Sequence, residues 1–236
     1  LRALEVINRS RSLVRRITGH DLALKFSFEA LKCVQEVLNL LPSQTEVHYT
    51  LKRRMIGIHM LIFHFALDSE NLGRSFLSIL DMIELAEEVR DVNGRSCWRD
   101  ALKTLINHCC KNGKLQWLCD IDEKIVHGID IVDCIRDYLY EQARDYTPKN
   151  FVTSHDAIYY ECLVSFLLVK KDFRKVAEVA LEYMDRLDGL LKSSPYHHHN
   201  DSMYSQLVLL TQWSGIAVNA LSMTPKYENT IRPSES

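Results

Sequence analysis

The stretch from Tyr159 to Leu187 constrains the fold most, because it has the pattern of two antiparallel helices joined by a tight turn. Its first part is apolar almost all round, which is typical of a helix buried between neighbours. Lys170-Lys171 places positive charge at the expected helix C-terminus, and Asp172 can cap the helix that follows. In that second helix the apolar residues fall at helical spacing and form one stripe: Phe173, Val176, Ala177, Ala180, Met184 and Leu187.

The opposite side of this second helix is charged. Arg174 with Glu178, and Glu182 with Arg186, are pairs four residues apart, and each such pair stabilises a helix by roughly 0.2–0.5 kcal/mol. The alanines keep the apolar stripe thin, so a partner helix can approach closely. The sequence therefore predicts a helix hairpin suited to stacking, with no sign of catalysis in it.

Helical periodicity extends over most of the chain, and no segment shows the alternation of a β-strand. Thr18-Gly19-His20, Asn93-Gly94 and Asn112-Gly113 are expected to separate helices. Ser43 or Thr45 is expected to start one helix, and Ser69 is expected to cap the next. Besides the hairpin, we expect helices over residues 3–17, 21–41, 45–67, 70–90, 97–111, 114–126, 129–146 and 201–222.

The helix pairs recur about every 35–45 residues, as helical repeats do, but no motif repeats. Ten helices exceed what the core of one bundle can hold. We therefore expect an all-α fold, an irregular α-solenoid of stacked antiparallel helix pairs, over residues 1–223. Leu1 is not an initiator Met, so we expect a fragment of a longer chain, and residues 224–236 are expected to be a polar tail or linker.

Composition excludes several classes of protein. The 236 residues are 47% hydrophobic and 25% charged, as in ordinary globular proteins, and the net charge of −2 provides no basic field for nucleic acid. The seven cysteines include no CxxC pair, which favours reduced thiols in a cytosolic or nuclear protein. No signal peptide and no apolar run of about 20 residues occurs, so we expect no transmembrane segment.

The residues that could carry chemistry have simpler structural interpretations. His197-His198-His199 cannot all face one metal ion from a regular backbone, and they lie in a polar stretch. Cys109-Cys110 lack a glycine-bordered elbow and are expected to be buried thiols. His59 and His64 lie five residues apart, so one is expected to pack and the other to be exposed. We expect no catalytic residue, no cofactor and no metal.

Three further groups favour structural roles. Trp98, Trp117 and Trp213 are expected in the core or between helices. The acidic residues at 120–123 lack the glycine and ligand spacing of a calcium loop, so a charged helix start is expected there. The arginines of the first helix and Lys52-Arg53-Arg54 lack interleaved aromatic residues, which favours solvated faces or a protein contact over nucleic acid.

The hairpin resembles part of a known family. Tyr159-Tyr160-Glu161, Lys171 to Ala177 and Glu182 to Leu187 resemble the α-solenoid of the large Y-complex nucleoporin, the propeller-plus-helical subunit of the one-sixty (vertebrate) or one-twenty (yeast) type. A looser similarity covers roughly residues 50–233 and includes Pro233. The positions that match the family's pattern are Tyr159, Tyr160, Phe166, Asp172, Phe173, Arg174, Ala177, Tyr183, Arg186, Pro225 and Tyr227.

The resemblance implies a non-enzymatic scaffold of the nuclear pore complex, located in the nuclear envelope. Its partners would be other Y-complex nucleoporins, with no small-molecule substrate and no direct contact to nucleic acid. It would support pore assembly, messenger RNA export and protein transport. Because stacked units bury their apolar faces on one another, open ends are expected at the first helix and around Trp213 and Leu221 in the last.

Two other functions remain open. A helical-repeat adaptor, such as a vesicle-coat or tetratricopeptide-like protein, would bind peptides in a groove with polar or aromatic side chains at repeated concave positions, and the sequence lacks that repetition. An all-α enzyme would need titratable residues that converge in one pocket, and none occurs at recognisable spacing.

Overall fold

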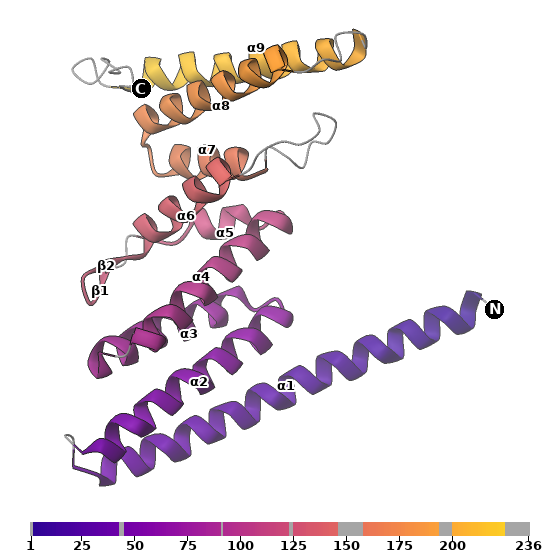
Figure 1. The fold of residues 1–236 in the computed structure, drawn as a ribbon. Helices are drawn as coiled ribbons and strands as arrows, with labels where there is room; N and C mark the ends of the chain where they lie inside the picture. Colours follow the sequence, from indigo (N-terminus) through magenta and orange to yellow (C-terminus); the bar gives the residue numbers. More distant parts are fainter. Residues whose placement is uncertain are drawn as a thin grey trace. The chain divides into compact units, whose positions relative to one another are not determined.

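A computed structural model describes residues 2–42, 45–90, 92–122, 125–145, 158–193 and 200–224. Helices dominate this part of the chain (Figure 1). They are α1 (Arg2–Leu40), α2 (Glu46–Asp68), α3 (Leu72–Val89), α4 (Val92–Lys111), α5 (Leu115–Cys119), α6 (Ile131–Asp145), α7 (Ile158–Val169), α8 (Phe173–Ser193) and α9 (Asn200–Met223). The only strands in the described ranges are β1 (Ile125–Val126) and β2 (Ile129–Asp130). The predicted all-α class is therefore confirmed.

The chain divides into two compact units. The first contains α1 to α3, α4 as far as His108, and the two strands. The second contains the end of α4 and α5 to α9. Each unit has its own buried apolar residues, so each is described by itself.

In the first unit, α2 packs against both α1 and α3. Ile62 and Phe63 of α2, with Ile79 and Ile83 of α3, are completely buried. The predicted cap of α2 is confirmed, because the Thr45 hydroxyl accepts a hydrogen bond from the His48 backbone N–H at 3.2 Å.

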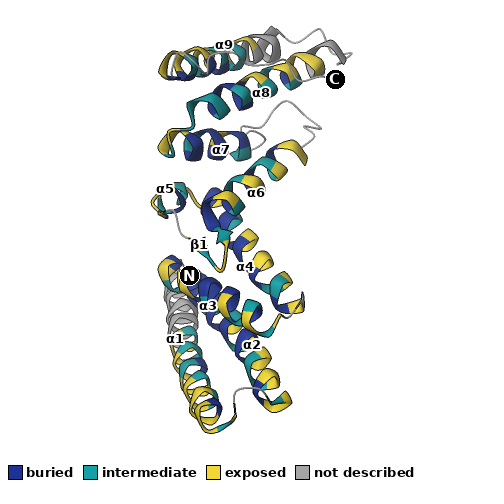
Figure 2. Cartoon of the chain, turned by 90° about the vertical axis from the view of Figure 1, so that its left-hand side faces the viewer, coloured by how far each residue is buried: buried dark blue, intermediate teal, exposed yellow. Residues whose placement is uncertain are grey.

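In the second unit, α8 packs against both α7 and α9, and α5 packs against α7. Leu163 of α7, with Val176 and Val179 of α8, is completely buried. The predicted cap of the hairpin is confirmed, since Asp172 Oδ1 accepts a hydrogen bond from the Lys175 backbone N–H at 3.3 Å. Buried residues line the sides on which α7 and α8 face their neighbours (Figure 2).

Three predicted helix boundaries are wrong. Gly19 lies inside the continuous helix α1, and Asn93-Gly94 lies inside α4. A glycine in a helix interior costs only about 1 kcal/mol, which neighbouring turns can offset. Ser69 ends α2, with its hydroxyl donating to the Phe65 carbonyl at 2.8 Å, and Asn71 is the residue that caps α3.

The prediction of helix over 114–126 is also wrong. Helix α5 ends at Cys119, and Asp120 follows it as a C-cap instead of starting a helix. The strands β1 and β2 then form an antiparallel hairpin with φ of 50° at His127 and 81° at Gly128. Positive φ at both turn residues matches the twist of two paired strands, so Gly128 turns a hairpin here.

Several predictions fall outside the described residues. They concern the histidines at 197–199 and the tail beyond Thr224, which includes Pro225, Tyr227 and Pro233.

Candidate protein-binding faces

Three aromatic rings hold the last three helices of the second unit together. Tyr160 of α7, Tyr183 of α8 and Trp213 of α9 lie with ring centroids 4.7 Å (Tyr160 to Tyr183) and 4.4 Å (Tyr183 to Trp213) apart. Tilted rings at these distances attract one another beyond the effect of their burial. The two tyrosines belong to the family-resembling positions, and the structure gives them a packing role.

A carboxylate at the edge of this aromatic cluster joins α6 to α8. Glu182 accepts hydrogen bonds from Arg144 Nε and Nη2, each at 3.0 Å, and lies 3.4 Å from Arg186 Nη2. The nearby Tyr160 hydroxyl is 3.5 Å from Glu182. Burial, together with this carboxylate, raises the pKa of Tyr160 to about 12. Arg186 is thus a structural contact of the hairpin.

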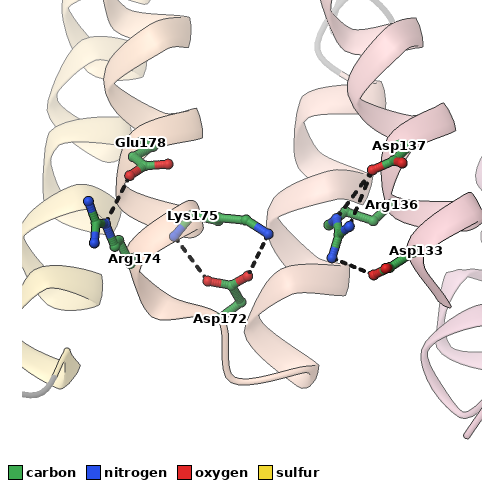
Figure 3. Close-up of polar contacts among 7 residues, drawn as sticks. All are labelled: Asp133, Arg136, Asp137, Asp172, Arg174, Lys175 and Glu178. Atoms are coloured by element: carbon green, nitrogen blue, oxygen red, sulfur yellow. Dashed lines mark hydrogen bonds and ion pairs between the residues drawn. The ribbon is translucent and has the colours of Figure 1, made fainter. Parts of the chain in front are cut away.

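The start of α8 carries ion pairs that stay within the helix (Figure 3). Arg174 Nε lies 3.1 Å from Glu178 Oε1, and Lys175 Nζ lies 3.3 Å from Asp172 Oδ2. Both predicted pairs of α8, Arg174 with Glu178 and Glu182 with Arg186, are confirmed. Arg174 and Glu178 are both partly exposed, and exposed pairs contribute little to stability, so the charged side of α8 is partly solvated at its start and packs against α6 further along at Glu182.

The remaining family-resembling residues divide into core and partly exposed positions. Phe166 and Ala177 are buried, whereas Tyr159 and Phe173 are only half-buried. The predicted apolar stripe of α8 is therefore completely buried at Val176, Ala177 and Ala180 and shallower at its first residue, Phe173. Periodicity missed Val179, which is fully buried, because it lies at the side of the stripe.

Helix α9 has two apolar sides. Trp213, Ala217 and Ala220 are buried at helical spacing on one side. The exposed half carries Leu207 (52% exposed) and Val218 (65%) along one edge and Met223 (59%) along the other. The expectation that Trp213 lies at an open end is therefore wrong, because its ring packs against α7 and α8.

The sequence contains a signal for this open side of α9 that periodicity does not use. Between Ser202 and Met223 no residue is charged. The solvent side of a surface helix normally carries charged residues. This uncharged helix exposes Leu207 and Val218, which lie eleven residues apart and therefore on one line along it, so the pair is a candidate contact face; we call these two residues the α9 face.

Helix α1, the first helix, also leaves an apolar stripe exposed, and an open end was predicted there. Leu22, Phe26 and Leu40 are 54%, 65% and 85% exposed, and Val37 lies on the same stripe. The opposite side of α1 packs against α2.

The cysteines and histidines have the predicted structural positions. Cys109 and Cys110 are buried, and burial raises the pKa of Cys109 to about 11, so its thiol stays protonated at neutral pH. His59 is buried and His64 is exposed, as predicted. Trp98 is buried and Trp117 is half-buried.

Within the described ranges, no three His, Cys, Asp or Glu side chains come together in a way that could hold a metal ion. No helix in the same ranges is both long and apolar enough to cross a membrane. Comparison with protein-family models, curated proteins and solved structures finds no match to this chain.

Proposed function

We propose that this chain is a non-enzymatic scaffold segment of the Y-complex nucleoporin type, built as an irregular α-solenoid. The observation that carries the proposal is the α9 face, an exposed apolar surface on a helix whose other side is already buried. Each helix pair of a solenoid buries one side against the previous pair and offers the other to the next. The exposed stripe on α1 fits the same arrangement.

The hairpin α7–α8 supports the nucleoporin type in particular. The residues that resemble that family supply two of the three rings of the aromatic cluster, the Asp172 cap and one partner of each predicted ion pair of α8. Under this proposal the protein resides at the nuclear pore in the nuclear envelope and binds other Y-complex nucleoporins. It supports pore assembly, and through that messenger RNA export and protein transport.

Charge substitutions on the α9 face test the proposal. The double variant Leu207→Glu and Val218→Glu places two carboxylates on exposed positions, so stability should change by less than about 1 kcal/mol. The tagged wild-type protein should form a rim at the nuclear envelope and recover Y-complex subunits in affinity purification. The double variant should lose both, because a charge buried in an apolar contact is costly.

Leu61→Glu is the matched control, because Leu61 of α2 is 52% exposed, the same as Leu207. It should keep the rim and the recovered subunits. A wild-type protein that is diffuse in the cytosol and recovered with vesicle-coat components would contradict the nucleoporin proposal and favour an adaptor.

A further inference from the structure

A groove lies between α1 and α3, over α2, within the first unit. Its volume is about 640 Å³. All three helices contribute apolar side chains to it: Phe28, Leu31 and Leu38 from α1, Met55 from α2 and Leu85 from α3. Leu38 and Met55 are almost fully buried, whereas the others are half-buried. The groove thus offers an apolar surface that no helix in the described ranges covers.

One wall of the groove is acidic. Asp81, Glu84 and Glu88 of α3 line it at spacings of three and four residues, so they form a row about 10 Å long on one side of the helix. Lys52 of α2 pairs with Glu88. Glu84 is exposed and has no ion-pair partner among the described residues.

The carboxylate of Asp81 is not neutralised by its neighbour His59. Its Oδ2 lies 3.3 Å from His59 Nδ1. Burial lowers the pKa of His59, more strongly than Asp81 raises it, and Arg74 adds to the lowering. The imidazole is therefore neutral at neutral pH, so Asp81 and Glu84 make the middle of the α3 wall negative, while Arg74, whose guanidinium lies 4.1 Å from the centroid of the Phe28 ring, places a positive charge before them on the same helix.

We propose that this groove binds an amphipathic helix of a partner protein, with an apolar face against the groove floor and a basic edge along α3. Lysine or arginine residues three and four positions apart on the incoming helix match the row formed by Asp81, Glu84 and Glu88. Lys32 on the α1 wall faces the other edge of that helix. Asp81 and Glu84, which are not neutralised by a lysine as Glu88 is by Lys52, disfavour an anionic ligand such as nucleic acid or an acidic lipid surface. This inference stands apart from the proposed function, which depends on α7 to α9.

Two synthetic peptides of about 18 residues test the proposal. Both have leucine along one helical face; the basic peptide has arginine along one edge, and the acidic peptide has glutamate there. Fluorescence anisotropy with the whole protein should show that the basic peptide binds at least about tenfold more tightly. Raising the salt concentration from about 50 to about 500 mM should reduce the difference in affinity between the two peptides, because salt screens the charges.

Reversing the charge of one acidic residue in the groove is the decisive part of this experiment. Glu84→Lys should weaken binding of the basic peptide about tenfold and strengthen binding of the acidic peptide. Glu36→Lys is the matched control, because Glu36 is an exposed residue of α1 that does not line the groove, and it should change neither affinity beyond about twofold. A misfolded variant would lose both peptides and could not give this exchange of preference.

Two results would overturn the proposal. The first is equal affinity of the two peptides, or equal effects of Glu84→Lys and Glu36→Lys. The second is a dimer in sedimentation velocity that Glu84→Lys dissociates, because the groove would then hold a second copy of this chain instead of a partner protein.

Discussion

At the scale of single residues, Glu182 is the carboxylate of α8 that connects this helix to α6. It joins Arg144 of α6 through three hydrogen bonds and also approaches Arg186 and the Tyr160 hydroxyl. Glu178, one turn earlier, has a single exposed pair with Arg174. Paired hydrogen bonds between arginine and a carboxylate are stronger than one exposed ion pair.

We therefore expect Glu182→Ala to lower the free energy of unfolding by about 1–2 kcal/mol, measured by urea denaturation. Glu178→Ala, the matched control on the same helix, should change it by less than about 0.5 kcal/mol. Similar losses for the two variants would mean that the contact between α6 and α8 contributes nothing to stability.

At the scale of helices, Gly19 distinguishes two descriptions of the N-terminal region. The sequence pattern predicts a helix end there, whereas the structure has one helix through it, with no positive φ at Gly19 and with room for a Cβ atom at this position. In a helix interior, Gly19→Ala should stabilise the protein by up to about 1 kcal/mol and raise the helical signal in circular dichroism. Gly113→Ala is the control for a true helix end: its φ of 66° should make the same change destabilising. If Gly19→Ala instead lowered the free energy of unfolding, a helix end at Gly19, and therefore two separate helices, would be the correct description.

The helix ends show why boundaries were harder to predict than helices. Glu70, Arg90 and Lys171 have φ between 51° and 60° at or just after helix ends, where sequence reasoning looks for glycine. The strands β1 and β2 are two residues each, too short for alternation to be visible. By contrast, the hairpin α7–α8 was predictable, since its apolar pattern, cap and charge pairs all agree.

The contact faces were predictable only in part, for a similar reason. Both sides of α9 are free of charge, so periodicity alone could not decide whether Trp213 or Val218 faces α8. The groove over α2 depends on residues of three helices that are far apart in sequence. Its acidic row is regular along α3, but only the packing of α1 and α3 on α2 gives it a floor.

At the scale of the whole molecule, the two compact units predict two responses to a core substitution. Leu163→Ala in α7 and Ile79→Ala in α3 each remove a completely buried side chain, one in each unit, and each should cost about 2–5 kcal/mol locally. In hydrogen exchange, Leu163→Ala should lower the protection of α7 and α8 more than that of α2 and α3, and Ile79→Ala should do the reverse.

The physical reason is that stability in stacked helical arrays is the sum of units and of contacts between nearest neighbours. A loss of stability in one unit then lowers the stability of distant helices only in part. The pair of substitutions controls for size, since each replaces a large aliphatic residue by alanine. Equal loss of protection throughout the chain for both variants would show instead that the helices unfold as one cooperative structure, and it would argue against the solenoid that we propose.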